Sequence, residues 1–282
     1  MEYSISGAVV YWTASKDTAA GALAANLQAI GLDKFVPTPA TDAVALKAAM
    51  TDLYAGATTG AGTNLIRPDR NGFSVVTETQ GVFGLSHDTS LHARFAHGHL
   101  SLTPQDHPDA ARLLAAIQSQ LDLVPTSSLT GALTAIVGHL GGVSMRPTGG
   151  IYWIPQRSLE MWGKVIKAVQ NSGASAVYMA QTVADAESVR AVCAAIQAEV
   201  GAEVERIRND LAEGLTNRSG RVRSAQLSAL GNRLREYESD LGTTLGDLRD
   251  ALSQMDHALL AAAGTEDWGA GSVATMFGGG FD

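Results

Sequence analysis

Apolar residues recur every three or four positions through the last third of the chain, and this is the most regular pattern in the sequence. A mean spacing of about 3.5 residues is typical of a helical seam of the coiled-coil type. A similar stripe runs from Val189 to Leu215, and the polar segment Asn217–Gly220 separates the two. The positions of the second stripe are Leu227, Leu230, Leu234, Tyr237, Leu241, Leu245, Leu248, Leu252, Met255 and Leu259.

We therefore predict a long antiparallel helical hairpin of the coiled-coil type over residues 181–263, because two helices joined by a short turn run in opposite directions. The stripes correspond to arms of about 34 and 42 residues, or roughly 50 and 60 Å at 1.5 Å per residue. Arms of this length either pack lengthwise on the rest of the chain or project and meet another chain.

The pattern over residues 1–180 is different and predicts a mixed α/β domain. A β-rich run, a helical stripe, an extended pair Phe35-Val36 and a second helix form one unit over residues 7–56. The same order of elements recurs over residues 150–200. This recurrence predicts an internal duplication, although strand–helix units are common enough for the match to be a coincidence.

Short β-rich runs lie between these units, over residues 65–104, and alternate with turns that contain glycine or aspartate. This alternation predicts a small antiparallel meander of about three strands. Helical stripes then follow Pro108 and Ser127. Together with the hairpin, these elements predict the fold class α+β.

Residues 264–282 are rich in glycine and have the composition of a flexible tail. Large apolar residues are nevertheless present among them. Such residues in a tail either anchor it in the groove of a partner or fold back onto their own chain. The candidate partner-binding residues of the tail are Trp268, Met276, Phe277 and Phe281.

The composition limits the class of protein. The chain has 282 residues, of which 45% are hydrophobic, and this is enough apolar material for a buried core. No apolar run approaches the ~18–20 residues of a membrane helix, and the first residues lack the pattern of a secretory signal. A single cysteine, Cys193, excludes an internal disulfide framework. We therefore expect a cytoplasmic protein that does not bind a membrane.

The net charge of −8 excludes a uniformly basic protein that coats nucleic acid, but charge is unevenly distributed along the predicted hairpin. Arginines gather near the predicted turn, whereas acidic residues predominate over residues 236–267. Guanidinium groups suit contacts to phosphate or carboxylate, so the tip is a candidate surface for nucleic acid or for an acidic protein. Ion pairs with neighbouring acids are the alternative. The tip residues are Arg206, Arg208, Arg218, Arg221 and Arg223.

Histidines between His87 and His107 provide the candidates for a metal site. On one strand, His97 and His99 would point to the same face, as a pair of metal ligands does. No third ligand follows at a defined spacing, and exposed histidines on a polar strand are the alternative. Cys193 lies on a helical stripe, where core packing is expected rather than a nucleophile.

Catalytic motifs are absent from the sequence. It contains neither a phosphate-binding loop of the Gly-x-x-x-x-Gly-Lys type nor a Gly-x-Ser-x-Gly elbow. We therefore predict no catalytic residue and no cofactor.

Three stretches of the chain resemble a family of uncharacterised proteins encoded by phages, plasmids and bacterial genomes. They are residues 65–68 with Gly72–Glu78, residues Gly149–Pro155, and the arginine-rich hairpin. The resemblance spans most of the chain before the tail and implies a mobile-element context. It implies no activity and no site residues.

These observations predict a non-enzymatic assembly or macromolecular-binding protein. It would self-associate, or bind a protein partner, through the helical hairpin and the aromatic tail. Two alternatives stay open. In the first, the arginine-rich tip binds nucleic acid, and in the second the segment from His87 to His107 serves a metal-dependent hydrolase.

Overall fold

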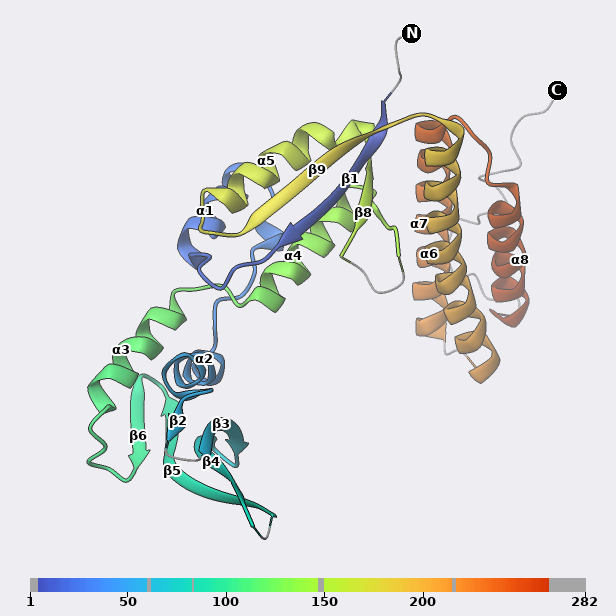
Figure 1. Ribbon diagram of the computed structural model, residues 1–282. Helices are drawn as coiled ribbons and strands as arrows, with labels where there is room; N and C mark the ends of the chain where they lie inside the picture. Colours follow the sequence, from blue (N-terminus) through green and yellow to red (C-terminus); the bar gives the residue numbers. More distant parts are fainter. Residues whose placement is uncertain (1–4, 60–61, 83, 147–149, 215–216, 264–282) are drawn as a thin grey trace, which may run out of the picture. The chain divides into compact units, whose positions relative to one another are not determined.

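The computed structural model describes residues 5–59, 62–82, 84–146, 150–214 and 217–263. These residues form two antiparallel sheets and eight α-helices, so the chain is a mixed α+β protein (Figure 1). The chain divides into two compact units, which we name after their most prominent elements. The meander unit holds residues 13–135 and 165–176, and the bundle unit holds residues 1–12, 136–164 and 177–282.

The sheet of the meander unit is a five-stranded antiparallel meander, in which each strand pairs with its neighbour in the sequence. It occupies the segment in which the β-rich runs lie and extends a few residues before it. Its order is β2-β3-β4-β5-β6, with β6 at one edge. The strands are β2 (Thr58–Thr59), β3 (Gly62–Asp69), β4 (Gly72–Gly81), β5 (Gly84–Ala96) and β6 (His99–Thr103).

Helices α2 (Asp42–Tyr54) and α3 (Ala110–Leu121) pack against each other and share one apolar core with this sheet. Helix α2 begins after Thr41, whose hydroxyl oxygen accepts a hydrogen bond from the N–H of Val44 at 3.5 Å. The buried residues of this core include Leu46, Met50, Val75, Leu91, Phe95, Leu113 and Ile117. The other helices before residue 180 are α1 (Ala20–Ala29), α4 (Thr126–His139) and α5 (Leu159–Gln170).

The sheet of the bundle unit has four strands in the order β7-β8-β1-β9. Strand β8 lies antiparallel to both β1 and β7, and Val10 stands opposite Tyr152. The ring of Trp12 stacks on the ring of Tyr152, with 5.1 Å between their centroids. The strands are β1 (Ile5–Thr13), β7 (Val143–Ser144), β8 (Tyr152–Pro155) and β9 (Ala176–Val183).

Helices α6 (Ala186–Glu213), α7 (Asn217–Leu241) and α8 (Gly246–Ala263) lie side by side in the bundle unit (Figure 1). Two ion pairs between α6 and α7, Glu199 with Arg233 and Asp210 with Arg223, fix an antiparallel alignment because residue numbers fall on one helix as they rise on the other. All ten apolar residues of the second stripe are buried in the shared core of these helices. The seam is therefore closed within one chain.

Trp153 joins this helical core to the sheet, since its side chain is completely buried among the bundle residues. The space it occupies exists because residue 7 is glycine. A Cβ atom on Gly7 would come within 2.7 Å of the indole and 2.2 Å of the carbonyl oxygen of Ile154. Arg157 adds a polar contact, because its guanidinium pairs with Glu236 at 2.7 Å and also with Asp240. The helices thus pack on the sheet of their own unit.

The prediction of one continuous second arm is wrong. Helix α7 ends at Leu241, and α8 starts only at Gly246. Gly242 has a φ of +61°, a left-handed conformation that commonly ends helices. The buried carboxylate of Glu238 accepts hydrogen bonds from the N–H of Leu245 at 2.7 Å and from Nε of Arg249 at 3.0 Å, which holds the turn closed.

The extended pair predicted at Phe35-Val36 is also absent. Residues Asp33–Phe35 form a 3₁₀ turn instead, so no strand follows α1 directly. In the second similar segment, residues 150–200, a strand does follow the helix, because β9 comes directly after α5. The two segments therefore share a first strand and a helix after it, and their first strands, β1 and β8, pair directly with each other.

We expect Gly242→Ala to lower the free energy of unfolding by about 1–2 kcal/mol, because alanine at a left-handed φ is strained. Gly246→Ala is the matched control. A Cβ atom added at either glycine would meet no heavy atom within 4 Å, so the two sites differ chiefly in backbone conformation. Urea denaturation of both variants measures the difference, and an equal effect at both sites would show that the turn conformation is not what limits stability.

Candidate functional site

The arginines predicted at the hairpin tip lie near the junction of α6 and α7, but most of those described are paired with acids. Arg206 contacts Glu203 at 2.6 Å, Arg208 pairs with Glu205, and Arg223 pairs with Asp210. Arg221 is exposed, and the side chain of Arg218 lies outside the described residues. Local ion pairs, the alternative considered for this tip, therefore occupy three of its guanidinium groups.

The histidines do not come together. His87 faces Glu78 at 3.6 Å, and His92 faces Asp69 at 3.3 Å. The prediction that His97 and His99 share a strand face is wrong, because β5 ends at Ala96 and His97 occupies a turn with a φ of +51°. In the part of the chain that the structure describes, no group of three His, Cys, Asp or Glu side chains is placed to hold a metal ion.

Two other features singled out in the sequence have structural places. Cys193 packs against the bundle core, and burial raises the pKa of its thiol, which disfavours the thiolate. Tyr11 of β1 stacks on Tyr178 of β9 with 4.9 Å between ring centroids, and each residue is 43% exposed. The aromatic residues of the tail lie outside the described residues.

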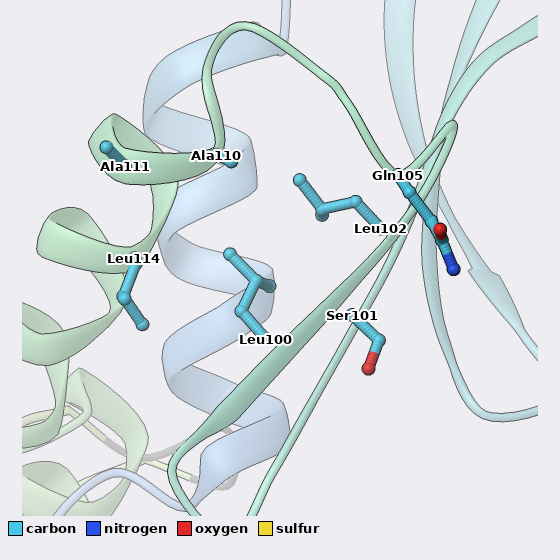
Figure 2. Close-up of a pocket in the computed structure, with 7 residues that line it drawn as sticks. All are labelled: Leu100, Ser101, Leu102, Gln105, Ala110, Ala111 and Leu114. Carbon is cyan, nitrogen blue, oxygen red and sulfur yellow. The ribbon is translucent and has the colours of Figure 1, made fainter.

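A groove between β6 and α3 in the meander unit is the most promising candidate site. This open groove has a volume of about 450 Å³, within the range of about 300–1,000 Å³ that is common for ligand pockets. Figure 2 shows Leu100 and Leu102 reaching from β6 toward α3, whereas Ser101 between them points away. This follows from the alternation of side chains along a strand. The groove is lined by Leu100, Ser101, Leu102, Gln105, Ala110, Ala111 and Leu114.

Strand β6 is an edge strand. It pairs with β5 on one side, with Leu100 opposite Phe95 and Leu102 opposite Ala93. Within the described ranges, no other segment forms a backbone hydrogen bond with β6. The outer row of N–H and C=O groups of β6 is therefore available to another extended chain.

Contacts at the start of α3 hold the helical wall of the groove in place. Tyr54, at the end of α2, donates a hydrogen bond from its hydroxyl to Oδ2 of Asp109 at 3.2 Å, and Ala110 then opens α3. Burial raises the pKa of Tyr54 to about 12, with the nearby Asp109 carboxylate adding to the effect. Tyr54 thus remains a protonated donor at neutral pH. Its ring also meets His107 edge-on, with 6.4 Å between centroids.

Seven uncharged residues set the chemical character of the groove. Its lining side chains are leucine, alanine, serine and glutamine, and none of them titrates near neutral pH. A partly apolar groove beside a free strand edge suits an extended peptide, because the backbone edge offers hydrogen bonds and the groove accepts alternate side chains.

The sequence matches one known protein family over most of its length. The model of DUF6744, a family of unknown function, matches residues 6–266. The chain belongs to this family. No curated protein and no solved structure matches the DUF6744 chain. In the described part of this DUF6744 protein, no helix is both long enough and apolar enough to cross a bilayer.

Sequence reasoning missed the groove residues of this DUF6744 protein. The alternation of Leu100, Ser101 and Leu102 was visible, and Pro104 just after β6 indicates the end of a strand. Those signals locate a strand with one apolar face. They carry no information on the helix that stands over the strand edge, because α3 reaches this position through its packing on α2.

We expect Tyr54→Phe to lower the free energy of unfolding by about 0.5–1.5 kcal/mol, because Asp109 loses its hydrogen-bond donor. Tyr178→Phe, at a residue that is 43% exposed, should change it much less. Thermal and urea denaturation measure both.

A comparison of the wild type with Tyr54→Phe tests the raised pKa of the Tyr54 hydroxyl. Folding keeps the Tyr54 hydroxyl protonated above pH 10, where the unfolded chain ionises, so stability falls as pH rises from 10 toward 12. The wild type should lose more stability than Tyr54→Phe over this range. Parallel pH profiles of the two proteins would contradict the assignment.

Proposed function

We propose that this DUF6744 protein is a non-enzymatic binding protein that holds an extended apolar segment of a protein in the groove between β6 and α3. One observation carries the proposal: the free edge of β6 lies beside a groove of about 450 Å³ that is lined by leucine and alanine together with Ser101 and Gln105. When a peptide adds as a strand to such an edge, main-chain hydrogen bonds supply affinity. Pockets for alternate side chains supply specificity.

The energetics favour a moderate affinity. Each large apolar side chain that becomes fully buried contributes about 1.5–3 kcal/mol. The groove has room for one or two such side chains, and the loss of translational and rotational freedom opposes binding by at least about 4 kcal/mol. Main-chain hydrogen bonds add about 0.5–1.5 kcal/mol each. With about four of them, the favourable end of these ranges corresponds to dissociation constants of about 1–100 µM.

The proposed function is still binding, as expected from the sequence, but the binding surface is the groove between β6 and α3 rather than the helical hairpin. The apolar seam, which was expected to meet a partner, is buried within the chain between α6, α7 and α8. Three tip arginines are engaged with Glu203, Glu205 and Asp210, so the tip offers less free positive charge than its sequence implies. The groove instead leaves both apolar side chains and a strand edge accessible.

Ala111→Arg tests the groove, and Ala115→Arg is its control. Both residues are exposed on α3, but only Ala111 lines the groove. Selection of a phage-displayed library of random 12-residue peptides on the wild-type protein should enrich peptides with alternating apolar residues. An enriched peptide should bind Ala111→Arg at least about tenfold more weakly, a loss of roughly 1.4 kcal/mol, because the new side chain fills the cavity.

Ala115→Arg should bind the same peptide as the wild type does, and circular dichroism should show both variants folded. Failure to enrich any peptide would contradict the proposal. So would an enriched peptide that binds Ala111→Arg and the wild type equally well.

A further inference from the structure

We infer that the segment that fills the groove is Ser272–Phe277 of a second copy of this chain, so that the copies assemble head to tail. This inference rests on the proposed function of the groove and names its ligand. The partner is identified by the fit between the free edge of β6, with the leucines and alanines of the groove beside it, and the composition of the C-terminal residues.

The composition of the C-terminal residues singles out this segment. From Trp268 to Phe281 there is no charged residue, and Ser272–Phe277 is the longest run without glycine after Ala263. Gly271 and Gly278 bound it on either side. Valine, threonine and phenylalanine favour strands, whereas glycine disfavours them. The run of six residues is close in length to β6, which spans His99–Thr103.

The alternation of the segment matches the alternation of the groove. On an extended chain, Val273, Thr275 and Phe277 share one face, and Ser272, Ala274 and Met276 share the other. We assign the first face to the cavity, because it presents Val273 and the large Phe277 ring to the leucines of β6 and α3. The second face, with Ala274, then points the same way as Ser101, away from α3 (Figure 2).

The place where the described chain ends allows the segment to reach a neighbour. The last described residue is Ala263, at the end of α8, and eight residues separate it from Ser272. At about 3.3 Å per residue, nine residue steps span up to roughly 30 Å. Three of the eight intervening residues are glycine, a residue that accepts a wide range of backbone conformations. The tether is long enough to carry the segment clear of its own bundle.

Each copy then carries one groove, built from β6 and α3, and one donor segment, which follows α8 in the sequence. Such a contact is heterologous, so it continues from copy to copy until a ring closes or a filament grows. The contact contains no ion pair, because neither the groove lining nor Ser272–Phe277 has a charged side chain. Assembly should therefore change little with salt concentration.

The first experiment is light scattering coupled to size exclusion on the full chain at rising concentration. The wild type should exceed the monomer mass of 29.3 kDa, whereas Ala111→Arg and Phe277→Asp should stay monomeric. Ala274→Asp is the matched control for the segment. Its side chain lies on the outer face, so assembly should persist. A wild type that stays monomeric up to several hundred micromolar (on the order of ten times the expected dissociation constant) overturns the inference.

Mixing the two monomeric variants gives the sharper result. Ala111→Arg retains the donor segment and Phe277→Asp retains the groove, so an equimolar mixture should form a dimer and stop there. A mixture that stays monomeric, or a Phe277→Asp protein that assembles as the wild type does, overturns the inference.

The experiment separates this inference from the function on which it rests. Under the inference, Phe277→Asp leaves the groove open and should bind a selected library peptide at least as tightly as the wild type does. If library peptides bind the groove but Phe277→Asp still assembles normally, the groove is a binding site for another protein and the self-donated segment is wrong. If Ala111→Arg affects neither peptide binding nor assembly, both proposals fail.

Discussion

Burial of Trp153 is the contact on which the bundle unit depends. Its completely buried ring lies between the sheet and the helices, and the absence of a side chain on Gly7 provides the space for it. Replacing a buried tryptophan by alanine commonly lowers stability by about 3–5 kcal/mol. The apolar seam of α6, α7 and α8 is buried in the same core, so folding removes this stripe from the surface.

The groove follows from a second constraint, which is that an open antiparallel sheet must have edges. Natural edge strands are commonly protected by charge, by proline or by a covering element. Strand β6 carries no acidic residue, lysine or arginine, and Pro104 comes only after its last residue. Helix α3 stands beside the strand without hydrogen bonding to its edge. A strand edge with an apolar wall is therefore left available, which is the arrangement that strand addition needs.

Residues singled out by their chemical type proved less informative than residues placed by packing. Arginines of the tip are largely paired with acids one turn away or on the facing helix, because a helix brings residues three positions apart onto one face. His97 and His99 are separated by a hairpin turn rather than aligned on one strand. In contrast, Leu100 and Ala111 have no reactive group, and they line one groove only because β6 and α3 lie next to each other.

Periodicity along the chain was enough to establish the classes of the longer elements, because it records which face of each element is buried, but not that of the 3₁₀ turn at Asp33–Phe35. It located the helical seam, the β-rich segment and the mixed α+β class. The break at Gly242 escaped detection, since the turn keeps Leu241 and Leu245 buried and so preserves the seam spacing. Closure of the seam within one chain and the position of β6 at a sheet edge became visible only in three dimensions. Both depend on contacts between residues far apart in the sequence, which a local pattern does not encode.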